Sequence, residues 1–140
     1  VRYLYHDPCH TPIKTKQPLA VVNELMGTAV RQNERCCGES GTLAVTRPDV
    51  STQVRFRKEE ELRQGAAALR AGGPGGAFAG DVKILTSCPS CLQGLARFSP
   101  DADLDADYIV VEMARHLLGP NWLPEFVERA NRGGIERVLL

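Results

Sequence analysis

The sequence predicts an α/β domain of three layers around a mostly parallel sheet, with cysteine loops at the C-terminal ends of the strands. Two short apolar runs, over 1–5 and 82–86, have the composition of buried strands. Each run is followed by a polar loop and then by a helical pattern, an alternation that is typical of parallel sheets. Cysteines stand just after both runs, at the edge where such sheets collect ligands.

In the N-terminal third, strands and helices are expected to alternate. Residues 1–5 (VRYLY) form the first strand. A helix over 18–26 follows, and Gly27 ends it because glycine readily adopts the left-handed backbone of a helix C-cap. We expect a short strand over 28–31 and a short helix over 42–46.

A longer helix is expected to begin with Asp49 as its N-cap, just after Pro48 halts the preceding helix, and to run to about Arg70. Apolar residues recur near helical spacing, which places the charged run RFRKEEELR mostly on the solvated outer face. The Gly-rich segment 71–80 is expected to be a loop. It lacks the G-x-G-x-x-G pattern and a following Lys-Ser/Thr, so it does not predict a phosphate site.

The remaining elements are expected toward the C-terminus. They are a strand over 82–86, helices over 92–98, 107–118 and 124–131, and a last strand over 136–140.

Composition limits the function classes. The 140 residues fit one domain, taken as 1–140, that is large enough to bury a core. Seventeen basic and seventeen acidic residues give a net charge of zero, which argues against nucleic-acid partners. No apolar run approaches the roughly 18 residues of a transmembrane segment. The chain begins at Val1 without Met, so we expect a fragment of a larger multidomain protein.

The five cysteines are the most informative feature. Their number is odd, and the sequence has the character of a cytoplasmic protein, where structural disulfides are uncommon. Cys36 and Cys37 are adjacent, whereas Cys88 and Cys91 have C-x-x-C spacing. Together with Cys9 they stand on three loops, which we expect to converge on one side of the sheet.

Several thiolates in one place favour an iron–sulfur cluster. Cys37 and Cys88 are expected at helix N-termini, where the helix dipole stabilises negative charge. Three alternatives stay open at this stage. They are a structural zinc site, which needs only four ligands, a thiol–disulfide site, and buried inert cysteines.

Two histidines flank Cys9. His6 and His10 are candidates for hydrogen bonds to sulfur or for proton relay, although ordering of the loop is the simpler role for His6. Nothing in this chain matches a flavin or nicotinamide fingerprint, so any FAD site must lie elsewhere in the full-length protein.

Three motifs carry a family resemblance: DPCH at 7–10, CCGESGT at 36–42 and SCPSC at 87–91. In this order they resemble the cysteine-rich CCG domain that occurs in heterodisulfide reductase and in the iron–sulfur subunit of glycolate oxidase. The amino-acid sequence in and around these motifs is still more similar to the C-terminal part of large bacterial FAD-linked oxidoreductases of the D-lactate dehydrogenase or glycolate oxidase type. The family usually carries two motifs in tandem. This chain has one, and the interval between its Cys37 and Cys88 is longer than is usual in the family.

The resemblance implies a cofactor and partners. It implies a [4Fe–4S] cluster of the noncubane kind, with zinc as the alternative. The ligands it implies are Cys9, Cys36, Cys37, Cys88 and Cys91. It also implies an electron-transfer role beside flavin and ferredoxin-like domains of the same full-length chain. The electron acceptor would be a quinone or another carrier. We expect a cytoplasmic location, peripheral at the inner membrane through the full-length protein, and no turnover by this fragment alone.

Overall fold

The sheet has four strands in the order β2-β1-β3-β4, all parallel. The computed structural model of the chain describes residues 1–9, 11, 13, 15–38, 43–72 and 77–133. The strands are β1 (Arg2–Tyr5), β2 (Arg31–Gln32), β3 (Val82–Thr86) and β4 (Asp105–Tyr108). The predicted fold class is therefore confirmed.

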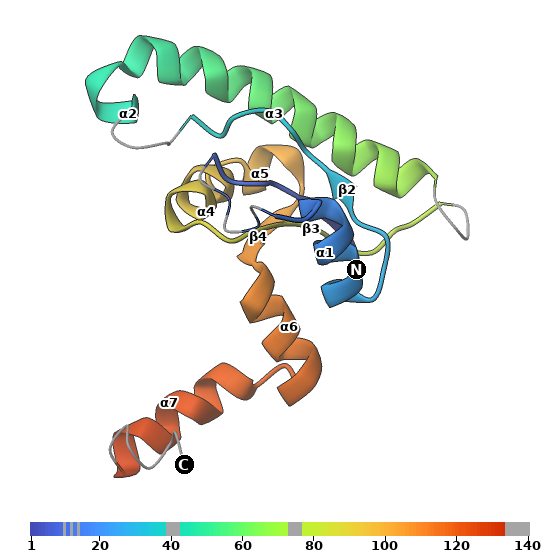
Figure 1. Ribbon diagram of the computed structural model, residues 1–140, viewed down its shortest axis with the longest axis vertical. Helices are drawn as coiled ribbons and strands as arrows, with labels where there is room; N and C mark the ends of the chain where they lie inside the picture. Colours follow the sequence, from blue (N-terminus) through green and yellow to red (C-terminus); the bar gives the residue numbers. More distant parts are fainter. Residues whose placement is uncertain (10, 12, 14, 39–42, 73–76, 134–140) are drawn as a thin grey trace. The chain divides into compact units, whose positions relative to one another are not determined.

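Helices connect and follow these strands (Figure 1). They are α1 (Pro18–Met26), α2 (Leu43–Thr46), α3 (Pro48–Ala71), α4 (Pro89–Ala96), α5 (Ser99–Ala102), α6 (Ile109–Leu118) and α7 (Trp122–Gly133). The chain divides into two compact units, Val1–Ile109 and Val110–Leu140. The first unit holds the whole sheet and all five cysteines.

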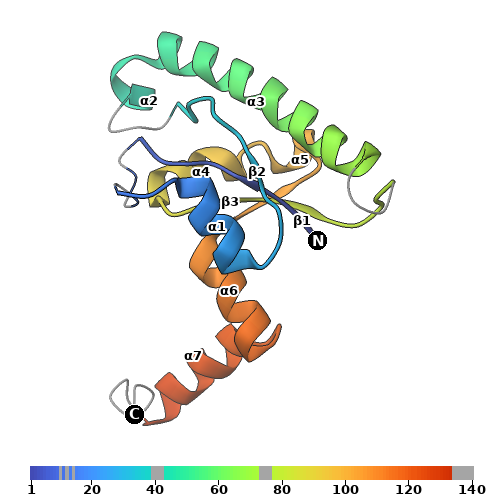
Figure 2. The same cartoon turned by 45° about the vertical axis from the view of Figure 1, so that its right-hand side comes forward.

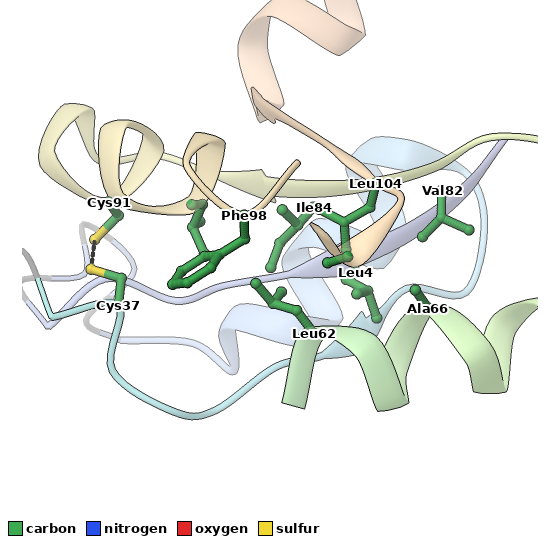
Figure 3. Close-up of a cluster of buried hydrophobic side chains, with 11 residues drawn as sticks. Leu4, Cys37, Leu62, Ala66, Val82, Ile84, Cys91, Phe98 and Leu104 are labelled. Atoms are coloured by element: carbon green, nitrogen blue, oxygen red, sulfur yellow. Dashed lines mark hydrogen bonds between the residues drawn. The ribbon is translucent and has the colours of Figure 1, made fainter. Parts of the chain in front are cut away.

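Both faces of the sheet are buried, as parallel sheets require. Leu4 and Ile84 contribute to a core with Leu62 of α3 (Figure 3), and Leu95 of α4 belongs to the same core. Side chains alternate along a strand, so Tyr3 and Tyr5, which are also buried, point to the opposite face. Figure 2 shows α1 on the side of the strands away from α3. Helices on both faces give the predicted three layers.

Several predicted boundaries were correct. Helix α1 spans 18–26, and Gly27 ends it with a φ of 65°. Strand β3 spans 82–86, and β1 lacks only the first residue of its predicted range.

Other predictions were wrong in detail. Strand β2 starts at Arg31 and is shorter than predicted. Pro48 is the first residue of α3, because the fixed φ of proline suits the first helical turn; Arg47, and not Asp49, is the N-cap. Helix α4 begins at Pro89, before its predicted start. Helix α5 was not predicted, and the predicted strand over 136–140 lies outside the described residues.

Strand β4 is the largest correction. A helix was predicted over 107–118, but residues 105–108 (DADY) pair with β3 and the helix α6 begins at Ile109. This strand lies at the end of the sheet order, and its first residue, Asp105, is exposed while the other three are half-buried. Because the strand is polar, it could not be predicted from runs of apolar residues.

Candidate metal centre

The carboxyl ends of β1, β2 and β3 lie at one edge of the sheet because the three strands run parallel. Cys9 follows β1, Cys36 and Cys37 follow β2, and Cys88 comes shortly after β3. Cys91 lies in the first turn of α4. The predicted placement of the cysteine loops at the C-terminal ends of the strands is confirmed.

The sulfur atoms of different loops are in contact. The Cys37 thiol donates to the Sγ of Cys91 at 3.6 Å, although the two residues are far apart in sequence (Figure 3). Two thiolates on one tetrahedral zinc lie about 3.8 Å apart for Zn–S lengths of about 2.3 Å. The spacing of Cys37 and Cys91 therefore suits two ligands of the same metal ion.

Further interactions join the other three cysteines to this pair. The side chain of Cys91 also hydrogen-bonds to Cys88. The side chain of Cys36 hydrogen-bonds to Cys9 and lies close enough to Cys37 for their charges to interact. All five sulfur-bearing side chains thus form one connected group.

The protein environment raises the pKa of two of these thiols. For Cys91, the hydrogen bond with Cys37 is the largest cause of the raised pKa, and burial adds to it. Burial raises the pKa of Cys36, against the smaller effect of the Gly38 N–H, which donates to its Sγ at 3.3 Å. Without metal these thiols keep their protons at neutral pH, so metal binding has to release them.

The described residues show one of the two predicted helix N-termini. Cys88 is at a helix N-terminus, as predicted: it is the N-cap of α4, and Pro89 is the first helical residue. Cys37 is different, since the next described helix, α2, begins only at Leu43. Because residues 39–42 lie outside the described residues, the expectation for Cys37 stays a prediction.

Gly38 lies tightly against α3. Its φ of 80° is left-handed, and a Cβ built there would lie 2.9 Å from Cγ of Arg55. Ser51 of α3 donates from its hydroxyl to the Gly38 carbonyl at 2.9 Å. The glycine therefore lets the Cys36-Cys37 loop turn while it stays in contact with the helix.

A buried polar group of α3 also holds this loop. Lys58 is 0% exposed, whereas the other charged residues of the run are exposed or half-buried, as predicted. Its Nζ donates to Oδ1 of Asn33, and lies 3.5 Å from the Oε2 of Glu61. The two carboxylate oxygens of Glu61 accept the backbone N–H groups of Glu34 and Arg35 at 2.8 and 2.9 Å. One turn of α3 thus fixes the backbone that leads to Cys36.

Burial lowers the pKa of Lys58 to about 8, while the nearby Glu61 carboxylate opposes this shift. Lys58 is consequently still mainly an ammonium group at pH 7. A buried cation that is paired with a carboxylate and neutral oxygens favours negative charge on the nearby thiols.

His6 lies among the sulfurs. One of its ring nitrogens and the Sγ atoms of Cys37 and Cys91 all lie within 4.8 Å of one another. A loop-ordering role for His6 was the simpler expectation from the sequence. The alternation of side chains along a strand could have predicted its position beside the sulfurs, because Leu4 faces the core that contains Cys37 and Cys91 and His6, two residues later, faces the same side. His10, the second histidine predicted beside Cys9, lies outside the described residues.

A cavity of about 360 Å³ opens beside Cys36, with Arg35, Val54 and Arg57 as its other lining residues. Cys36 is half-buried and Cys9 is exposed, whereas Cys37 and Cys91 are buried. Small solutes can therefore reach the group from the Cys9 and Cys36 side.

Two families match the chain. The family described as "Cysteine-rich domain" (CCG) matches residues 3–96, and a "Domain of unknown function" (DUF3400) matches residues 96–140. No curated protein and no solved structure matches. The CCG match contains every cysteine of the site.

None of the helices in the part of the chain that the structure describes has the length and apolar character needed to cross a bilayer.

Replacing Gly38 by alanine should destabilise the domain by about 1–3 kcal/mol, because alanine disfavours the left-handed backbone and its Cβ meets Arg55. Urea unfolding followed by far-UV circular dichroism measures this change. Gly72→Ala is the control, with an extended backbone and open space around the new Cβ, and should change stability by less than about 0.5 kcal/mol. Equal losses in the two variants would contradict the packing described for Gly38.

Iodoacetamide should modify the metal-free chain in a defined order. Cys9 is exposed and should react first, whereas buried Cys37 and Cys91 should react at least about tenfold more slowly because thiol reactivity requires access and a thiolate. Peptide mass spectrometry of timed samples gives the rate at each site. Chain unfolded in urea is the control and should show nearly equal rates. Rapid labelling of Cys91 in the folded chain would contradict its placement.

Proposed function

We infer that this chain, which belongs to the cysteine-rich CCG domain family, is an iron–sulfur electron-transfer module. In this proposal Cys9, Cys36, Cys37, Cys88 and Cys91 hold a [4Fe–4S] cluster, in the noncubane form that the resemblance implies. The family and the gathered cysteines themselves indicate a metal or iron–sulfur site.

One observation carries the proposal: five thiols from three separate loops form one connected group at a single sheet edge. Their chemistry fits, since thiolate is the preferred ligand of iron–sulfur clusters. A single tetrahedral ion needs only four ligands, so the fifth thiol favours a centre with several metal atoms. When bound, such a cluster accepts and donates single electrons.

The other residues of the site suit a centre that carries negative charge. Cys37 and Cys91 are 1% and 4% exposed, which keeps water away from their sulfurs. The Lys58 ammonium lies close enough to Cys36 and Cys37 for their charges to interact, and the Gly38 N–H donates to Cys36. Backbone and side-chain donors of this kind stabilise cluster charge and raise the reduction potential.

The wider role follows from the family resemblance. We propose that the domain belongs to a FAD-linked oxidoreductase that oxidises a 2-hydroxy acid of the lactate or glycolate type. Electrons would leave the flavin, pass through ferredoxin-like clusters of the same full-length chain and reach this domain. A quinone or another carrier would accept them. The protein would be cytoplasmic and would associate with the inner membrane through its other parts. The 140-residue chain by itself would have no turnover.

Zinc is the second candidate, and a specific observation favours it. The ring of His6 and the sulfurs of Cys37 and Cys91 form a compact group within 4.8 Å, which matches the nitrogen and sulfur donors that zinc prefers. In that case the domain would be a structural or interaction module without redox activity. Metal content separates the two candidates directly.

Anaerobic reconstitution with iron and sulfide should give a coloured protein with about four iron and four acid-labile sulfide atoms per chain. Its reduced or oxidised form should have an EPR signal. Cys37→Ser and Cys91→Ser should each lose most of the iron, because they remove the two buried ligands. Val45→Ser is the control, since it adds the same side chain at a position that is 83% exposed, and should keep the full iron content.

Two results would overturn the proposal. One is a colourless protein that binds about one zinc per chain and no iron, which would establish the second candidate. The other is reductase activity with dithiol substrates that is lost in Cys91→Ser while the protein binds no metal, which would establish a thiol–disulfide site.

A further inference from the structure

The buried Lys58 makes a contact that the proposed function does not require. Its Nζ lies 3.1 Å from Nδ1 of His6, the side chain that reaches the sulfurs of Cys37 and Cys91. We propose that Lys58 fixes His6 as an N–H donor toward these sulfurs, so that His6 is a hydrogen-bonding residue of the site and not a metal ligand. Lys58 is then the positioning residue. Only the effect on a bound cluster rests on the proposed function.

The surroundings of Lys58 define its role as a donor. The side chain is fully buried, and the groups around Nζ are Nδ1 of His6, two oxygens of Asn33 and a carboxylate oxygen of Glu61. The oxygens are acceptors, and an ammonium group has three N–H donors and no lone pair. The arrangement therefore suits the charged form of Lys58, which can only donate to His6.

This contact determines the tautomer of the imidazole ring. A neutral histidine has one protonated and one unprotonated ring nitrogen. Because Nδ1 accepts from Lys58, the ring proton of His6 must be on Nε2. In a metal site, the hydrogen bond at one ring nitrogen sets the state of the other in the same way.

The hydrogen-bonding capacity of the other ring nitrogen of His6, Nε2, is not satisfied within the described residues. Nε2 is buried and, within the described residues, has no hydrogen-bond partner. Buried N–H groups without partners are rare because burial removes the water that would otherwise accept their proton. The sulfurs of Cys37 and Cys91 lie within 4.8 Å of a ring nitrogen of His6, and as thiolates or as ligands of a bound centre they can accept this proton.

The two ring nitrogens therefore leave no lone pair for a metal. Nδ1 is occupied by Lys58, and a protonated Nε2 cannot coordinate. The compact His6, Cys37 and Cys91 group thus consists of two sulfur ligands and one donor to them. The same donor, with the cation behind it, should stabilise the more negative state of a cluster and raise its reduction potential.

Nitrogen-15 NMR of the reduced, metal-free chain at pH 7 tests the tautomer without any cofactor. Long-range proton–nitrogen correlations distinguish protonated from unprotonated ring nitrogens, and the chain has only three histidines, which His10→Gln and His116→Gln assign. We expect His6 with protonated Nε2 and unprotonated Nδ1. Protonated Nδ1 in the wild-type chain would overturn the proposal, whether or not any variant folds.

Lys58→Met tests the role of the lysine at similar side-chain length. The variant should lose the single tautomer of His6 and show a mixture of both forms. Lys16→Met replaces a lysine at an exposed position and is the matched control, which should keep the wild-type pattern. A folded Lys58→Met chain that keeps the wild-type pattern would overturn the assignment of Lys58 as the positioning residue.

Reconstituted protein supplies a second readout. His6→Gln should keep its iron, because a donor and not a ligand has been replaced, and its reduction potential in a redox titration should become more negative. Loss of iron from His6→Gln would overturn the proposal by making His6 a ligand. If neither the wild-type chain nor the variants bound iron, the proposed function would fail. The NMR result would still decide the tautomer of His6.

Discussion

Parallel pairing of β1 with both β2 and β3 is the constraint on which the site depends. It brings three chain segments to one edge of the sheet, each with its cysteines just beyond the last paired residue. An antiparallel partner would carry its loop to the opposite edge. The contact between Cys37 and Cys91 is the direct result of this topology, because it joins the loop after β2 to the helix after β3.

Helix α3 then fixes the geometry of the site at which the loops meet. Ser51 holds the Gly38 carbonyl, and Glu61 holds two backbone N–H groups before Cys36. Lys58, from the same helix, places a cation and an oriented histidine behind the sulfurs. The helix also contributes Leu62 and Ala66 to the apolar core. Core packing and the position of the cysteine loop are consequently coupled, so damage to α3 should affect both.

Much of this arrangement could be predicted from local patterns, and the exceptions have physical reasons. The apolar run of β3 and the Gly27 cap of α1 are local signals, and both were interpreted correctly. The edge strand β4 carries acidic residues and could not be found by an apolar search. Helical spacing puts Lys58 on the same face of α3 as Leu62, but a lysine is rarely buried, and its burial depends on tertiary contacts with Asn33 and His6. The cysteines were found because their residue type limits the chemistry, whereas the groups that hold them are ordinary residues.

The claim that the loops meet can be tested by disulfide formation in the folded, metal-free chain. The Sγ atoms of Cys37 and Cys91 lie 3.6 Å apart, so a small movement brings them to the roughly 2.05 Å of a disulfide bond. Long equilibration in a glutathione redox buffer, which allows for the slow reaction of these buried thiols, followed by peptide mapping, should give a Cys37–Cys91 disulfide that is not favoured when the chain is oxidised in urea. A folded chain that yields only the local pairs Cys36–Cys37 and Cys88–Cys91 would contradict the convergence of the loops.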